Sequence, residues 1–216
     1  MNQGARPTRV VVLLSGRGSN FQAIAEADLP IEMVAVISNR PQAAGLAYAR
    51  EHGMTAIALD HTTQPDREVF DAQLADEIER YQPDLVVLAG YMRILSPAFI
   101  ARFENRLLNI HPSLLPAFPG LKTHARALAE GVKIHGCTVH FVTTQLDHGP
   151  IVIQAAVPVV ADDTVDSLAA RVLAQEHRIY PQAVRWFAEG RLVNNHGCVN
   201  LKDDLASQSV LSSPDV

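Results

Sequence analysis

The sequence predicts an α/β protein built on a Rossmann-like, predominantly parallel sheet with helices on both faces. Strand-like apolar runs alternate with segments of helical spacing through the first half of the chain. The runs at residues 10–14 and 85–90 are continuously apolar, which is typical of parallel strands covered on both sides. A glycine-containing loop follows the first run and precedes a helix-type pattern, the usual order of a strand, a tight loop and a helix.

The first half of the chain, about residues 8–105, is predicted to be a nucleotide-binding half. Phe70, Leu74 and Ile78 recur at helical spacing, and Pro83 separates that helix from the next buried strand. We expect strands at residues 10–14, 31–37, 55–59 and 85–90, with helices starting at residue 21 and spanning residues 41–51 and 65–81.

The second half, about residues 106–192, is predicted to add antiparallel strands and a long helix. Strands are expected at residues 107–111, 136–144 and 150–159, with a proline-rich loop at 112–120 and a turn at 146–150. A helix over residues 163–189 follows from apolar positions such as Leu168, Val172 and Ile179. Residues 8–192 then form one domain, and residues 193–216 lose periodicity, as expected of a flexible tail.

The composition excludes several classes of protein. The 216 residues are 48% hydrophobic, enough for a sizeable core, and contain neither a membrane-spanning run nor a signal-peptide pattern. Lys and Arg total 18 against 23 acidic residues, which gives no global field for a nucleic acid. Two cysteines, Cys137 and Cys198, do not make a disulfide framework. We therefore expect a cytoplasmic protein that binds small molecules, with no membrane or nucleic-acid partner.

The loop at residues 15–20 is a candidate anion site, because its glycines let the backbone approach a phosphate. A dinucleotide fingerprint would need a further glycine where Phe21 stands. It would also need an acidic residue at the end of the second strand, where Asn39 and Arg40 stand instead. NAD binding is therefore disfavoured, and a tight turn without a ligand is the alternative.

Asn109 and His111 are the strongest catalytic candidates from the residues themselves. Strand alternation puts both side chains on one face, about 7 Å apart. An amide donor beside a titratable imidazole suits acyl transfer, which needs oxyanion donors and a proton shuttle. A structural histidine is the alternative. No paired histidine motif occurs among the nine histidines, so no metal site is predicted.

Three further positions carry weaker signals. Asp147 lies in a turn, where aspartate is common, and could hold His111 as an imidazolium if the turn closes over that strand. His140 faces the same way as Thr138 on the following strand, and is either structural or functional. Glu176 falls on the apolar stripe of its helix, so it needs a partner, either a buried cation or a ligand hydroxyl or amine.

Five blocks of the sequence together resemble the phosphoribosylglycinamide formyltransferases, a folate-dependent family of purine synthesis. The blocks are GRGSN at residues 16–20, MRILSP at 92–97, LNIHPSLLP at 108–116, LDHGP at 146–150 and QEHRIYP at 175–181. The resemblance extends from about residue 8 to residue 192. His148 and Lys122 depart from the family, which commonly has glycine and often histidine at these places.

The resemblance implies that 10-formyltetrahydrofolate, as co-substrate, donates its formyl group to the amine of glycinamide ribonucleotide. It assigns catalysis to Asn109, His111 and Asp147. The residues it implies for the ribonucleotide are Gly18, Ser19, Asn20 and Glu176. Those it implies for the folate are Arg67, Met92, Arg93, Ile94, Leu95, Asn109, Thr143, Thr144, Gln145, Leu146 and Asp147.

Other functions remain open at this point. A formyltetrahydrofolate hydrolase shares this core but has a preceding regulatory domain, and methionyl-tRNA formyltransferase carries a further basic domain. A non-catalytic nucleotide-binding module would need only the glycine loop. The oligomeric state, monomer or homodimer, does not follow from the sequence.

Overall fold

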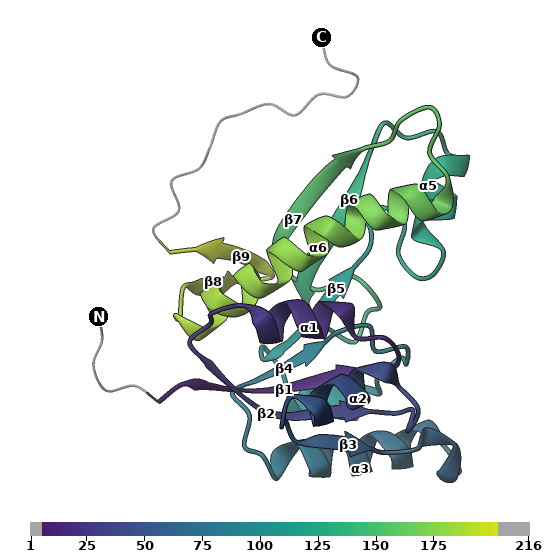
Figure 1. Ribbon diagram of the computed structural model, residues 1–216. Coiled ribbons are helices and arrows are strands. Elements are labelled where there is room, and N and C mark those ends of the chain that lie inside the picture. Colours follow the sequence, from purple (N-terminus) through teal and green to yellow (C-terminus); the bar gives the residue numbers. More distant parts are fainter. Residues whose placement is uncertain (1–5, 203–216) are drawn as a thin grey trace.

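The computed structural model describes residues 6–202, whose main feature is a sheet of seven strands in the order β3-β2-β1-β4-β5-β6-β7 (Figure 1). The strands from β3 to β5 run parallel, while β6 and β7 are antiparallel additions. The predicted fold class is confirmed. The strands are β1 Thr8–Leu14, β2 Ile31–Ser38, β3 Ala56–Ala58, β4 Leu85–Leu88, β5 Leu107–His111, β6 Ile134–Phe141 and β7 Ile151–Pro158.

Two apolar cores cover the two faces of the sheet. Val10, Val12 and Leu14 of β1 join the core that contains side chains of α1, α2 and α6, whereas Val11 and Leu13 join the core of α3 and α4. This alternation is what a strand buried on both faces requires. The helices are α1 Ser19–Glu26, α2 Ala44–Glu51, α3 Arg67–Glu79, α4 Pro97–Arg102, α5 Thr123–Ala129 and α6 Val165–Ala188, with a 3₁₀ turn η1 at His61–Thr63.

The topology creates a crevice between β1 and β4. After β1 the chain adds β2 and β3 on one side, and it then returns to place β4 on the other side of β1. Open α/β sheets bind ligands at such a switch point, beyond the carboxyl ends of the strands. The Ser15 N–H donates to the Gly90 carbonyl at 3.1 Å, which ties together the two loops that border this crevice.

Helix α6 lies beside α1 over the same face of the sheet (Figure 1). It begins with a capping box, in which Thr164 and Ser167 exchange hydrogen bonds with each other's backbone. Tyr180 is fully buried, and its hydroxyl oxygen lies 3.0 Å from the carbonyl oxygens of both Leu88 and Leu108. The helix is thus attached to the last residue of β4 and to Leu108 within β5, which fixes the position of Glu176 above the sheet.

The structure differs from the sequence predictions in several segments, and the strand predicted at residues 136–144 is β6, which already ends at Phe141. The predicted helix at residues 41–51 starts only at Ala44, after a turn in which the Ala43 N–H donates to the Arg40 carbonyl. Helices α4 and α5 were not expected, because each is only six or seven residues long and shows too little periodicity. Strands β8 Leu192–Asn195 and β9 Cys198–Leu201 form a hairpin in the predicted tail.

The expectation of a flexible tail at residues 193–216 is therefore wrong for the hairpin. The polar residues there form a short two-stranded ladder with a turn at His196 and Gly197, and the Gly197 N–H donates to the Oδ1 of Asn194 in β8. The rest of the predicted tail, residues 203–216, lies outside the described residues. Within residues 6–202, no helix has the length and apolar character to cross a membrane.

Candidate active site

Asn109 is held by an imidazole on the neighbouring strand. The antiparallel register of β5 and β6 sets Asn109 opposite His140, and the Asn109 Nδ2 lies 3.1 Å from the His140 Nε2. The His140 Nδ1 lies 2.9 Å from the Phe141 carbonyl oxygen, so Nδ1 carries the hydrogen and Nε2 accepts from Asn109. Burial lowers the pKa of His140, which favours this neutral form. One amide hydrogen of Asn109 is thereby committed and the other remains available.

His111 is oriented from both sides of its ring. Its Nε2 lies 3.1 Å from the Phe118 carbonyl oxygen, an acceptor, so this nitrogen donates. Its Nδ1 faces the Asp147 Oδ2 at 3.6 Å, and the two side chains are only 8% and 9% exposed. Because Nε2 already carries a hydrogen, Nδ1 is the position at which a proton can pass between the imidazole and the carboxylate.

Asp147 is positioned by its backbone as well as by its contacts. Its φ of 51° lies in the left-handed region, which aspartate tolerates better than most residues. Its Oδ2 accepts a 2.7 Å hydrogen bond from the Gly120 N–H, so the proline-rich loop and the 143–149 turn meet at this oxygen. Gly149 is required nearby, because a side chain there would collide with the Phe141 carbonyl oxygen.

A small cavity of about 110 Å³ opens beside Asn109 and Asp147. Its wall combines residues from the loop after β4, from β5 and β6, and from the 143–147 turn. The wall includes Tyr91, Arg93, Ile94, Leu95, Asn109, His140, Thr143, Thr144, Gln145, Leu146 and Asp147. Ile94 and Leu146 are more than half exposed, as is Met92 on the same loop, so the cavity mouth is flanked by uncovered apolar side chains.

Arg93 contributes a cation to this cavity. Its guanidinium carbon lies 4.7 Å from the centroid of the Phe70 ring, an arrangement suited to a cation–π contact. Its buried Nε has no hydrogen-bond partner within residues 6–202. Arg67 is separate from this group, because it is exposed at the start of α3, does not line the cavity, and pairs with Glu68 at 3.1 Å.

The glycine loop lies at the start of α1 and meets α6. Gly18 is the N-cap residue with a φ of 74°, and it makes no side-chain cap, so the first N–H groups of the helix stay unbound by a side chain. Asn20 Nδ2 donates to Glu176 Oε2 at 2.7 Å, and both side chains are buried. Burial raises the pKa of Glu176, an effect partly offset by the hydrogen bond from Asn20.

The structure thus brings most of the predicted residues into two neighbouring groups around the β1–β4 crevice. Asn109, His111 and Asp147 meet at the end of β5, while Gly18, Ser19, Asn20 and Glu176 meet at the α1–α6 contact.

Sequence reasoning left the role of His140 open, and the antiparallel register was the signal that could have paired it with Asn109. It missed Gly120 and Phe118, whose backbone groups carry no sequence signal. No group of three metal-ligating side chains occurs in the described part of the chain.

Comparison with known proteins defines the class of enzyme. The formyl transferase family model matches residues 8–184. The chain is 52% identical over 187 residues to the phosphoribosylglycinamide formyltransferase of Escherichia coli strain K12, covering 85% of this chain and 88% of the relative. Its structure is similar to glycinamide ribonucleotide transformylase 1 from Symbiobacterium toebii, with a TM-score of 0.89, 51% identity and coverage of 93% of this chain and 97% of that one.

A further solved structure gives the same result. The phosphoribosylglycinamide formyltransferase from Coxiella burnetii, in complex with CHES, matches with a TM-score of 0.87 and 46% identity, covering 90% of this chain and 93% of that one. The chain belongs to the formyl transferase family. Within that family its similar relatives are phosphoribosylglycinamide formyltransferases, which confirms the resemblance seen in the sequence.

Proposed function

We propose that this enzyme transfers the formyl group of 10-formyltetrahydrofolate to the amine of glycinamide ribonucleotide, giving N-formylglycinamide ribonucleotide and tetrahydrofolate. The observation that carries the proposal is the convergence of Asn109, His111 and Asp147 at one strand end. The high identity to phosphoribosylglycinamide formyltransferases over most of their length supports the choice of substrates.

Asn109 and His111 stabilise negative charge in the proposed reaction. The substrate amine attacks the formyl carbon, a C–N bond forms, and the carbonyl oxygen becomes an oxyanion. The uncommitted amide hydrogen of Asn109 is the hydrogen-bond donor for this oxygen, and a positive charge on the His111 ring, whose two nitrogens face Phe118 and Asp147, stabilises the oxygen electrostatically. Because both side chains are already held by protein groups, little reorganisation is needed when the charge develops.

Asp147 handles the proton in this proposal. The attacking amine becomes cationic and must lose a proton before the bond from the formyl carbon to the folate nitrogen breaks. The Asp147 carboxylate can take this proton, and its contact with the Nδ1 of His111 stabilises the imidazolium. Asp147 then gives this proton to the departing folate nitrogen as the bond to the formyl carbon breaks, so protons and charges balance and the carboxylate is restored.

The two substrates are assigned to the two groups of residues. The cavity wall with Arg93, Ile94, Leu95 and the 143–147 turn suits a flat heteroaromatic ring, so we assign it to the folate, with Met92 at the mouth. Arg67 is exposed at the start of α3, and we assign it to the outer part of the folate. Gly18, Ser19 and Asn20 hold the ribonucleotide phosphate, and Glu176 accepts from its ribose hydroxyls.

The remaining finer assignments are the compartment and the assembly. We propose a cytoplasmic enzyme, because the composition suits a reducing compartment and its substrates are small soluble metabolites. The site requires neither a monomer nor a homodimer, since one chain supplies every residue named above.

One assay tests the reaction and separates it from hydrolysis. The protein is mixed with 10-formyltetrahydrofolate, with and without glycinamide ribonucleotide, and the release of tetrahydrofolate is followed. We expect release only when the amine is present, together with one equivalent of formylated ribonucleotide. Release without the amine would instead assign a formyltetrahydrofolate hydrolase, and no release in either case would contradict both.

A further inference from the structure

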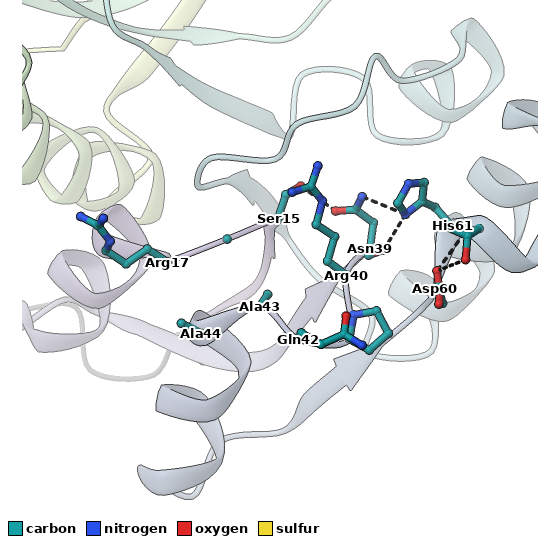
Figure 2. A pocket seen from close by; sticks show the side chains of 12 residues that line it. Ser15, Arg17, Asn39, Arg40, Gln42, Ala43, Ala44, Asp60 and His61 are labelled. Atoms are coloured by element: carbon teal, nitrogen blue, oxygen red, sulfur yellow. Dashed lines mark hydrogen bonds between the residues drawn. The ribbon is translucent and has the colours of Figure 1, made fainter. Parts of the chain in front are cut away.

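A second cavity opens at the carboxyl ends of β1, β2 and β3, and it contains none of the residues assigned above. Its volume is about 560 Å³, within the range of small-molecule sites. The β1–α1 loop, the β2–α2 loop and the η1 turn form its wall (Figure 2). This edge of an open α/β sheet is where ligands bind.

Asn39 is the buried polar side chain of this wall, and its orientation is fixed. It is 2% exposed. The Ser15 Oγ accepts from the Met92 N–H at 2.8 Å, so the hydroxyl hydrogen is free to donate to the Asn39 Oδ1 at 2.6 Å. The oxygen of the Asn39 amide therefore faces Ser15 and the NH₂ group faces the other way, toward His61 (Figure 2).

The amide NH₂ of Asn39 has no acceptor in the described part of the chain. The His61 Nδ1 lies 2.8 Å from the Asn39 carbonyl oxygen, and a carbonyl accepts only, so this nitrogen carries the hydrogen. The same nitrogen then cannot accept from the Asn39 Nδ2, which lies 3.4 Å away. Because Asn39 lines the cavity and its NH₂ group has no protein acceptor, this group is available to donate to an acceptor on a ligand.

Two more donors without partners lie on the same wall. Arg40 is exposed, lines the cavity together with Ser15 and Asn39 (Figure 2), and pairs with no acidic side chain among residues 6–202. Helix α2 begins at Ala44 without a side-chain cap, and the Ala44 N–H has no backbone acceptor in that part of the chain. An amide, a guanidinium and a helix N-terminus together favour an anion.

One acidic residue defines the opposite side of the cavity. Asp60 uses its Oδ1 to accept from the Thr62 N–H at 2.9 Å and the Thr62 hydroxyl at 2.7 Å. These hydrogen bonds lower the pKa of Asp60, so it is ionised at neutral pH. Its Oδ2 is left to accept from a hydroxyl. The preferred ligand is therefore anionic at one end and carries a hydroxyl group at the other.

We propose that this cavity binds a phosphate monoester of a small polyhydroxylated molecule, such as a sugar phosphate or a nucleoside monophosphate. The phosphate oxygens accept from the Asn39 amide, the Arg40 guanidinium and the Ala44 N–H, and a ligand hydroxyl donates to Asp60. This site is separate from the glycine-loop residues Ser19 and Asn20, and it does not depend on the proposed formyl transfer.

Isothermal titration calorimetry of the full chain tests the proposal, with inorganic phosphate, ribose 5-phosphate and AMP as probes. The background variant Asn20→Ala weakens the glycine-loop site, so that the second site is measured alone. In that background we expect ribose 5-phosphate or AMP to bind at least tenfold more tightly than inorganic phosphate. The tighter of the two identifies the source of the phosphate monoester.

Two variants assign the binding to the cavity. Arg40→Gln should weaken binding at least tenfold and leave the KM for glycinamide ribonucleotide unchanged. Arg50→Gln, an exposed arginine on the same helix, is the matched control and should bind as the parent does. Asn39→Asp keeps an acceptor for the Ser15 hydroxyl but removes the donor and adds a negative charge, so it should abolish binding while thermal melting reports an intact fold.

Three results would overturn the proposal. The first is an absence of measurable heat with all three probes up to 10 mM, a concentration about tenfold above a weak millimolar Kd. The second is that binding of the phosphate probes disappears in Asn20→Ala and is unchanged in Arg40→Gln. The probes would then bind at the glycine loop, where the ribonucleotide phosphate is assigned. The third is equal binding by Asn39→Asp and the parent.

Discussion

At the residue scale, the site depends on side chains whose hydrogen bonds leave one group available. His140 commits one hydrogen of the Asn109 amide, and the Phe118 carbonyl commits the Nε2 of His111. The remaining amide hydrogen of Asn109 is available to the substrate, and the Nδ1 of His111 faces the Asp147 carboxylate. Such preorganisation stabilises the developing charge without new ordering.

Replacing Asp147 by asparagine tests the proton transfer. The amide keeps the size of the side chain but is not a base, so we expect kcat to fall by about 10²–10⁴-fold. The dissociation constant for the folate should change by less than about threefold, as measured by fluorescence titration. Asp162→Asn, at an exposed position, is the control and should leave kcat unchanged. Equal losses in kcat and folate affinity would contradict the catalytic role.

Replacing Glu176 by glutamine should separate stability from binding. Burial raises the pKa of Glu176, so the folded state favours the protonated form. In the unfolded chain a glutamic acid ionises at a pKa of about 4.3, whereas burial makes the same ionisation harder in the folded protein. The free energy of unfolding therefore decreases as the pH rises above about 4.3. The variant removes this penalty at neutral pH and keeps an acceptor for Asn20. We therefore expect a higher Tm for the free protein together with a higher KM for the ribonucleotide.

An unchanged KM in Glu176→Gln would remove the proposed ribose contact. An unchanged Tm with a raised KM would keep that contact and show that the desolvation of the carboxylate is fully offset by Asn20. Glu26→Gln serves as the control for the change in net charge, because this residue lies on α1 and its only side-chain hydrogen bond within residues 6–202 is with the hydroxyl of Tyr48.

At the element scale, helix α6 carries Glu176 and is attached to the sheet through Tyr180. The Tyr180 hydroxyl reaches the carbonyl oxygens of Leu88, the last residue of β4, and of Leu108 in the neighbouring strand β5. Burial raises the pKa of this hydroxyl well above its usual value, so it stays a donor at every ordinary pH. A displacement of α6 would therefore also displace the proposed ribose site.

Tyr180→Phe removes this attachment without creating a large cavity. We expect a loss of about 1–2 kcal/mol in the free energy of unfolding, measured by urea denaturation, because buried carbonyl oxygens lose a donor. Tyr81→Phe is the control, since the side chain of Tyr81 makes no hydrogen bond recorded within residues 6–202 and lies on the other core. A fall in stability of the same size in both variants would contradict a specific role for Tyr180.

At the scale of the whole molecule, we expect the buried histidine His135 to lower the stability at acid pH. His135 is 1% exposed and its Nε2 lies 3.2 Å from the Nδ1 of His124. Burial, together with the charge of His124, lowers the pKa of His135 to about 4. The unfolded chain binds this proton near pH 6.5, so unfolding takes up protons between pH 6.5 and 4.

The free energy of unfolding should therefore fall as the pH drops from 6.5 to 4, by up to about 3 kcal/mol from His135 alone. Above pH 6.5 this contribution should be constant. Urea denaturation at a series of pH values measures the slope, and His135→Gln should flatten it while His52→Gln, an exposed control, should not. An unchanged slope in His135→Gln would assign the acid sensitivity to other groups.

Local patterns in the sequence determined a large part of this protein. The continuous apolar runs required a doubly covered parallel sheet, and strand alternation gave Asn109 and His111 a shared face, because both depend only on neighbouring residues. The position of Glu176 on an apolar helical stripe likewise required a partner, which Asn20 supplies.

Only the tertiary structure decided the remaining contacts. The approach of Asp147 to His111 joins residues 36 positions apart (147 − 111), and it depends on a left-handed turn and on the backbone N–H of Gly120. The pairing of His140 with Asn109 depends on the register between β5 and β6. The unpartnered amide of Asn39 depends on which atom of His61 carries the hydrogen. Long-range backbone geometry sets all three, and a local pattern of residue types does not encode it.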